Sequence, residues 1–468
     1  MNFIITGIAI AYISVSGFGL IKLLLKDNIP LSIFGIVPLS FGAGLGTLAV
    51  LCSCIMILGL KTSFMTIYPP LAIPFIYALT HINYRIKTDA GIVIRTIKGI
   101  SWKEWLLIFV ILFGALSVFF LSVDFPLHFW DSRAIWGSNA KLLYFNGTAF
   151  SPDYRDMSRI HALGHPLLFP ISQASIYFAL GQADDWAVML LIGLFFPFMV
   201  SFLYDLARIY LQDREKALAA AALLAVLPVF FMSDGPAYSG YADTPLSMLY
   251  CLSFGVALLW KKNKDFGYLL LSAFMTGLLF LTKFEGINLI ALNVLLMVLP
   301  DRFNFNIQII IDSLRNLAIY LMVIVLIASL GLPFFDATGG GVGNIINNLQ
   351  KAPILVSFTF NAFLGIQKNM MNQGFLWGIL WTIFFITTMI SIFFRFLYCT
   401  YLSLIVLAYF IIINMIYIIN PWEISAGLMV SNFFRFYQAV NPIVALQIVA
   451  TIKALESMNP LHKEKQVR

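Results

Sequence analysis

Long apolar stretches separated by short polar breaks dominate the pattern of the chain. Many of them hold about 18 or more residues, enough to cross a hydrocarbon layer of roughly 30 Å as a helix. They lack the alternation of apolar and polar positions that marks the strands of a membrane barrel. The pattern predicts an all-α, polytopic transmembrane protein with about thirteen spans. The predicted spans are 3–23, 31–60, 65–82, 104–122, 185–207, 217–232, 242–260, 267–281, 286–300, 317–335, 374–394, 397–418 and 439–455.

Composition agrees with this class. Of the 468 residues, 60% are hydrophobic and 11% are charged, which is too much apolar surface for domains folded in water. The formal charge of +7 does not indicate nucleic-acid binding, because lysine and arginine commonly gather in the cytoplasmic loops of membrane proteins. All four cysteines lie inside apolar stretches, so they predict packing rather than disulfides or a metal site.

The positions of the basic residues predict the orientation of the spans. When the spans alternate in direction, the basic breaks all fall on one side, which the positive-inside rule assigns to the cytoplasm. This requires residues 165–181 to form a helix at, or dipping into, the membrane surface rather than a full crossing. The opposite side then holds segments 123–184, 233–241, 282–285, 336–373 and 419–438.

Domain organisation follows from the same pattern. We expect an amino-terminal three-span unit with its cytoplasmic loop at 1–103 and a transmembrane core at 104–335. An external loop at 336–373 and carboxy-terminal spans with a short basic tail at 374–468 complete the chain. The external loop at 123–184 is the most informative segment, because long loops in a compact protein are usually functional.

Acidic side chains stand at the start of this external loop. Asp124 and Asp131 follow the fourth span, and charged groups at the edge of hydrocarbon are costly unless they are paired or functional. From Ser132 onward the apolar residues fit short interfacial amphipathic helices, with Arg133 available for anionic groups. The ordinary alternative is that either acid caps a helix or pairs with Arg133.

Further charged residues recur on the same predicted side. His165 precedes the surface helix, Asp243 begins the seventh span, Lys283 and Glu285 interrupt an apolar stretch, and Arg435 precedes the last span. A simple ion pair between Lys283 and Glu285, or a snorkelling Arg435, would account for each feature alone. Their accumulation on one face of the membrane instead favours a functional site.

Several short motifs resemble one known group of enzymes. They are Trp130-Asp131, Ile135-Trp136, Ala140-Lys141, His165-Pro166 with Pro170, Tyr241-Ala-Asp243-Thr-Pro245, Thr282-Lys283-Phe-Glu285-Gly286, and Arg435 before Pro442. Together they resemble the GT-C superfamily of membrane glycosyltransferases, especially its protein-mannosyltransferase-like and aminoarabinose-transferase-like branches. The resemblance covers roughly residues 104–455. The three spans before residue 104 depart from the family layout, in which the acidic loop follows the first helix.

The resemblance implies transfer of a sugar from a polyprenyl-phosphate donor to an acceptor at the non-cytoplasmic face, with inversion at the anomeric carbon. It implies general-base catalysis by Asp131, with Asp124 second and Asp243 third. Similarity to the family assigns the donor phosphate to His165, Lys283 and Arg435. The candidates for binding the sugar or the acceptor are Trp130, Arg133, Trp136, Tyr241 and Glu285.

No cofactor is expected, although some relatives use a divalent cation, which Asp124, Asp131 or Asp243 would hold. The expected partners are the polyprenyl-phosphate-linked sugar, an acceptor that the sequence does not name, and the lipid bilayer, but no nucleic acid. The chemistry of the residues agrees, because glycosyl transfer needs a carboxylate for the acceptor hydroxyl and cations for the departing phosphate. The expected location is a bacterial inner membrane, with the site facing outward.

Two other functions fit the composition. A secondary transporter also carries charged residues within its spans, but near the membrane midplane and usually in two repeated halves. A surface-polysaccharide polymerase or ligase would also use polyprenyl-linked sugars, but its long external loop usually lies late in the chain. Here the charges gather at one face and the longest predicted loop lies early.

Overall fold

The computed structural model describes residues 1–26, 29–97, 99–155, 165–299, 307–335, 380–419 and 435–458. These residues form helices and connecting turns without a strand, so the predicted all-α class is confirmed. The helices are α1 (Asn2–Leu25), α2 (Ile33–Ile57), α3 (Phe64–Ile97), α4 (Trp102–Val123), α5 (Ser138–Asn146), α6 (Leu168–Leu180), α7 (Asp185–Leu211), α8 (Arg214–Ala225), α9 (Val229–Met232), α10 (Asp243–Asn263), α11 (Phe266–Thr282), α12 (Gly286–Val298), α13 (Ile307–Ser329), α14 (Leu332–Phe335), α17 (Leu380–Phe393), α18 (Leu397–Ile419) and α20 (Asn441–Met458). A helical turn at Ser132–Gly137 precedes α5, and a short turn spans Asp153–Arg155.

Eight helical segments in the described part of the chain are long and apolar enough to cross a membrane. Four further apolar helices, α6, α11, α12 and α17, are shorter. The chain is therefore a multi-pass membrane protein, while the count of about thirteen spans stays a prediction. The predicted external loop at 336–373 lies outside the described residues.

Two connections rich in basic residues, α7–α8 and α10–α11, lie at the same end of the helical bundle as the end of α20. Lys262 donates to the carbonyl of Ile209 at 3.2 Å, which joins the end of α10 to the end of α7. Lys216 at the start of α8 pairs with Glu456 near the end of α20 at 2.6 Å. The predicted alternation of spans had placed these breaks together, and the contacts agree with it.

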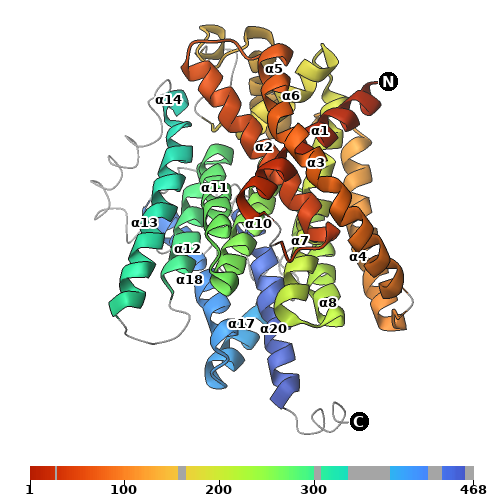
Figure 1. Cartoon of the computed structure of the whole chain (residues 1–468), viewed down its shortest axis with the longest axis vertical. Helices are drawn as coiled ribbons and strands as arrows, with labels where there is room; N and C mark the ends of the chain where they lie inside the picture. Colours follow the sequence, from red (N-terminus) through yellow and green to blue (C-terminus); the bar gives the residue numbers. More distant parts are fainter. Residues whose placement is uncertain are drawn as a thin grey trace.

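The opposite end of the bundle carries the first external loop. Figure 1 shows α5 and α6 near the end of the molecule that lies opposite the C-terminus. Lys141 of α5 pairs with Asp185 at the start of α7 at 2.7 Å, and Tyr177 of α6 donates to the same carboxylate at 2.9 Å. The Thr62 hydroxyl donates to the carbonyl of Gly147 at 2.9 Å, which holds the loop after α5 against the connection between α2 and α3.

Helix α6 forms within the range 165–181, where a helix at the membrane surface was predicted. Its 13 residues extend about 20 Å, too short for a full crossing, as the alternation of spans requires. However, residues 168–177 are all buried, and the helix packs against α1, α2 and α5. Helix α6 is therefore enclosed by other helices of the protein, while its position at the membrane surface stays a prediction.

Glycines allow the amino-terminal helices to pack closely. A Cβ atom on Gly17 of α1 would lie 2.0 Å from the carbonyl oxygen of Ser40 in α2, and one on Gly44 would lie 2.1 Å from the carbonyl oxygen of Ile13. Helix α2 also packs against α7, α10 and α11. The first helices are therefore joined to the rest of the bundle by close helix packing.

Replacing Gly17 with Ala is expected to destabilise the protein by at least about 1–3 kcal/mol, because the new methyl group must separate two helix backbones. Gly7→Ala is the matched control, since a Cβ at Gly7 of the same helix meets nothing within 4 Å. Thermal unfolding of the purified variants in detergent measures the difference. Equal midpoints for the two variants would contradict the close packing of α1 on α2.

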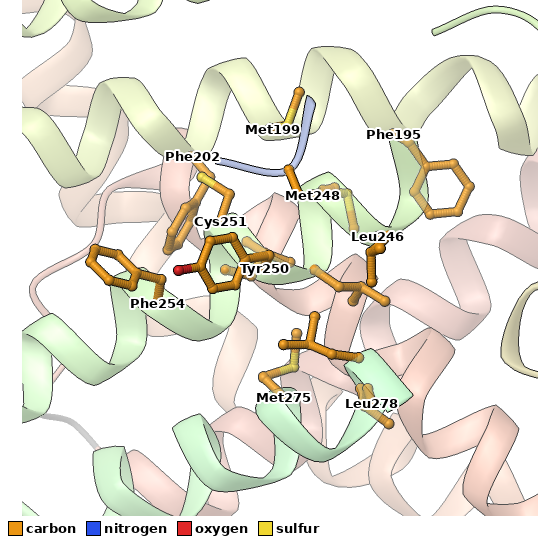
Figure 2. Close-up of a cluster of buried hydrophobic side chains, with 14 of the residues drawn as sticks. Phe195, Met199, Phe202, Leu246, Met248, Tyr250, Cys251, Phe254, Met275 and Leu278 are labelled. Carbon is orange, nitrogen blue, oxygen red and sulfur yellow. The ribbon is translucent and has the colours of Figure 1, made fainter. Parts of the chain in front are cut away.

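Helix α10 is the central helix of the bundle. All residues of its membrane-spanning window are buried, and its side chains pack between α7 and α11. Figure 2 shows this core, with Phe195 and Phe202 from α7, Tyr250 and Phe254 from α10, and Met275 from α11. The N-terminal residue of this buried helix is Asp243, so the packing of α10 also determines where that carboxylate lies.

Polar side chains add specific links within this apolar core. The Asn293 side-chain amide in α12 donates to the hydroxyls of Ser253 in α10 and Thr276 in α11, each at 2.9 Å. The Thr276 hydroxyl also bonds to that of Tyr320 in α13 at 2.7 Å. Buried hydrogen bonds of this kind fix the relative rotation of neighbouring membrane helices.

Candidate active site

Arg435 joins two carboxylates that lie far apart in the sequence. Its Nη2 atom donates to Oδ2 of Asp131 and to Oδ2 of Asp243, each at 2.8 Å, and its Nε atom donates to the same Asp243 oxygen at 3.0 Å. The two carboxylates are 304 and 192 residues from Arg435 along the chain. Charged hydrogen bonds of this length and low exposure fix the arrangement of all three side chains.

Lys283 extends the cluster on the other side of Asp243. Its Nζ atom donates to Oδ1 of Asp243 at 2.8 Å and lies 3.4 Å from Oε1 of Glu285. The side chains of Asp243 and Lys283 are only 3% and 9% exposed. Both oxygens of Asp243 are therefore engaged by buried cations, whereas Glu285, at 26% exposure, and Asp131, at 19%, reach the surface of the cluster.

The ends of helices place these side chains. Asp243 is the first residue of α10, where a carboxylate is also favoured by the helix dipole. Lys283 lies in the tight turn between α11 and α12, which the hydrogen bond from the Gly286 nitrogen to the Lys283 carbonyl closes at 2.9 Å. A Cβ on Gly286 would lie 2.1 Å from the carbonyl oxygen of Leu279, so only glycine fits this turn.

Asp131 is positioned by the connection between α4 and α5. Directly after it, the Ser132 hydroxyl donates to the carbonyl of Phe129 at 2.8 Å, and the Arg133 nitrogen donates to the same carbonyl at 3.0 Å. Gly240, whose φ of 79° suits glycine, packs against Ser132, where a Cβ would lie 3.0 Å from the Ser132 Cβ. The loop that leads into α10 thus supports the segment that carries Asp131.

Aromatic rings surround the charged cluster. The ring of Tyr241 lies 4.6 Å from the Arg435 guanidinium carbon, within the range of a cation–π contact. On the side of Lys283 and Glu285, the rings of His165 and Trp136 have centroids 5.0 Å apart. Trp136 is 1% exposed, so it is part of the protein interior and not an anchor at the membrane interface.

The protonation of His165 follows from its surroundings. Burial lowers the pKa of His165 below its ordinary value of 6.5, and the neighbouring Glu285 only partly opposes this effect. The imidazole is therefore neutral at neutral pH. In this state it offers hydrogen bonds rather than a positive charge to a ligand.

His165 is also expected to make the stability of the protein depend on pH. Because its pKa is lowered in the folded state, the unfolded chain binds a proton that the folded protein excludes, and stability falls as the pH drops below about 6.5. His165→Gln should make this decline shallower between roughly pH 5 and 6.5. Thermal unfolding of both proteins across this range measures it; identical profiles would mean that His165 does not contribute.

Not every residue predicted for the site joins this cluster. The structure brings together Asp131, Asp243, Lys283, Glu285 and Arg435, with Tyr241, Trp136 and His165 beside them. Asp124, Trp130 and Arg133 are exposed. Among the described residues, Asp124 and Arg133 form no ion pair with the cluster, so their predicted roles depend on contacts with a substrate.

Sequence reasoning missed two residues beside the site. Gln438 lies one helical turn after Arg435, and its side-chain amide donates to the carbonyl of Gly235 at 2.9 Å. Gly235 itself packs against Arg435 and Tyr241. Neither residue carries a charge or belongs to a recognisable motif, so a single sequence offers no signal for them.

Comparison with known proteins gives one match, over part of the chain. The fold defines a multi-pass membrane protein, and part of the chain matches one family model. The matching family model is described as dolichyl-phosphate-mannose-protein mannosyltransferase and covers residues 164–331, so the resemblance predicted from the motifs is confirmed over that part. This range includes His165, Asp243, Lys283 and Glu285. No curated protein and no solved structure matches the chain.

Proposed function

We propose that the protein transfers a sugar from a polyprenyl-phosphate donor to an acceptor hydroxyl, at the outward face of a bacterial inner membrane. The observation that carries this proposal is the cluster in which Arg435 joins Asp131, from the predicted external loop, to Asp243. A carboxylate for the acceptor and a cation for the donor phosphate then lie side by side, as glycosyl transfer requires.

In this proposal Asp131 is the general base. Arg435 binds only its Oδ2 atom, and its Oδ1 atom accepts no hydrogen bond from the described residues. The acceptor hydroxyl gives its proton to Oδ1 as its oxygen bonds to the anomeric carbon. The bond between that carbon and the phosphate oxygen breaks at the same time, and its electrons leave with the phosphate. Displacement from the opposite face inverts the anomeric centre.

Arg435 is proposed to hold the departing phosphate. Its Nε and Nη2 atoms face the two carboxylates, while its Nη1 atom donates to none of the residues that the structure describes. Nη1 therefore remains for a phosphate oxygen without loss of the contact that holds Asp131. Asp243, with both oxygens engaged, acts here as the anchor of the two cations rather than as a base.

The net charge of the cluster sets a limit on how the donor binds. Lys283 and Arg435 face three carboxylates, Asp131, Asp243 and Glu285, so the cations are already compensated before any ligand enters. A phosphate must then share Arg435 with these carboxylates. His165, neutral and close to Lys283 and Glu285, would supply hydrogen bonds to the donor without adding charge.

An exposed apolar helix face beside the site suits the lipid part of the donor. The outer face of α4 from Phe109 to Asp124 lines a space of about 760 Å³ that ends next to the loop carrying Asp131. Among its lining residues, Leu116 and Phe120 are 46% and 60% exposed. We propose that a polyprenyl chain lies along this face within the bilayer, with its phosphate directed toward Arg435.

The position of the cluster argues against a transporter. Asp131 lies in the predicted external loop between α4 and α5, and Arg435 joins it to Asp243, so the charges gather at that loop rather than between two repeated halves. A transporter would carry its substrate across without breaking a glycosidic bond.

The test is to incubate the purified protein with a panel of radiolabelled polyprenyl-phosphate sugars and membrane extract. The proposal expects one label to move from the donor to a component of the extract, with release of polyprenyl phosphate. If label moves from none of the donors while the protein accumulates a solute in proteoliposomes, the function is transport and the proposal is wrong.

A further inference from the structure

The loop between α9 and α10 packs directly against the guanidinium group of Arg435. Gly235 in this loop is buried, and a Cβ at this position would lie 3.1 Å from the Arg435 Nε atom and 2.9 Å from Cδ2 of Tyr241. The Tyr241 ring itself lies 4.6 Å from the guanidinium carbon. Gly235 and Tyr241 thus both lie against the side chain that joins the carboxylates.

The loop is tied to the same helical turn that carries Arg435. The Gln438 amide is completely buried and donates to the carbonyl of Gly235 at 2.9 Å and to the hydroxyl of Ser233 at 3.2 Å. Because residues 435–438 form one helical turn, Gln438 fixes the distance between that turn and the loop. This hydrogen bond holds the backbone of Gly235 close to the turn that carries Arg435.

Gly235 is not required here for a left-handed backbone, because it is not among the glycines of positive φ. Gly235 matters at this position because it has no side chain. Any larger residue would push either the Tyr241 ring or the Arg435 side chain. The added Cβ would displace the buried ring, and it would also push the guanidinium group relative to Asp131 and Asp243.

We propose that Gly235 and Gln438 are positioning residues that hold the Arg435 guanidinium in register with both the catalytic carboxylate and the donor phosphate. The inference rests on the proposed function and assigns these roles to two residues that lie outside the motifs of the chain. Neither residue touches the substrate; each acts through Arg435.

The experiment is a double-mutant cycle on Gly235→Ala and Arg435→Ala, read by binding as well as by turnover. Undecaprenyl phosphate without sugar is the binding probe, and affinities are expressed per folded molecule after thermal unfolding of each variant. We expect Gly235→Ala to weaken binding and to lower kcat/KM by about 10- to 100-fold, because small displacements of a positioning group cost about that much. In the Arg435→Ala background the same change should have no further effect.

Two further variants separate positioning from general packing. Gln438→Met keeps the size of the side chain and removes its amide, so it should weaken probe binding in the same direction as Gly235→Ala. Gly7→Ala is the control for a glycine with open space around it, and it should bind the probe like the unchanged protein. If Gly235→Ala lowers stability but leaves affinity per folded molecule unchanged, or if its effect adds fully to that of Arg435→Ala, the positioning role is wrong.

The cycle also separates this inference from the proposed function. If the unchanged protein binds no undecaprenyl phosphate and transfers no sugar, both fail together. If it binds and transfers but Gly235→Ala behaves like Gly7→Ala, only the positioning role is lost.

Discussion

Replacing Asp131 with Asn is expected to lower kcat for sugar transfer by roughly 10²- to 10⁴-fold, the range typical for loss of a general base. The amide oxygen of Asn keeps the hydrogen bond from Arg435, so the shape of the cluster and the binding of the donor should change little. Turnover with the labelled donor identified by the panel, and binding of undecaprenyl phosphate, measure the two effects separately.

Asp124→Asn is the comparison that makes this result specific. Both carboxylates belong to the same external loop, but Asp124 is exposed and forms no ion pair with Lys283 or Arg435. The Asp131 variant should lose turnover while the Asp124 variant keeps it. Full activity of Asp131→Asn together with loss in Asp124→Asn would move the base to Asp124, the second candidate from the sequence.

Replacing Asp243 with Ala is expected to cost about 3–5 kcal/mol of stability, because it leaves the cations of Lys283 and Arg435 largely buried without their shared partner. The side chain is 3% exposed and bonds to both cations at 2.8 Å, so solvent screens these contacts little. The same variant should lose transfer activity, since Arg435 would no longer be held beside Asp131. Thermal unfolding in detergent and the transfer assay measure the two losses.

The matched control is Glu456→Ala, which breaks the ion pair with Lys216 at the other end of the bundle. Glu456 is 41% exposed, and exposed pairs contribute about 0–1 kcal/mol. A large difference between the two variants is therefore expected. If Asp243→Ala unfolds at the same temperature as Glu456→Ala, the buried cluster does not contribute to stability as the geometry implies.

Together, the two variants test how turnover and stability are divided between the two carboxylates. Asp131 reaches the surface of the cluster and has an oxygen left for chemistry, whereas Asp243 has none. Loss of the first should affect mainly turnover, and loss of the second should affect folding as well. This contrast between two carboxylates on one arginine does not depend on the identity of the sugar or the acceptor.

Hydrophobic pattern alone was enough to establish the class of the protein and the boundaries of most helices. A helix that lies in lipid must be apolar over its whole length and must satisfy its own backbone hydrogen bonds, so its local sequence carries the signal. The predicted spans 104–122 and 397–418 correspond closely to α4 (Trp102–Val123) and α18 (Leu397–Ile419). The motifs also named the charged residues of the site, because a charge at the edge of hydrocarbon is conspicuous.

Only the tertiary structure decided which of those charges meet. Asp131, Asp243, Lys283 and Arg435 come from four separate connections or helix ends, and no local pattern records their distances. The same holds for Gly235, which matters for the volume it leaves free, and for α6, whose buried position depends on the helices around it. Local sequence determines which segments enter the membrane, whereas the approach of distant side chains depends on how all the helices pack.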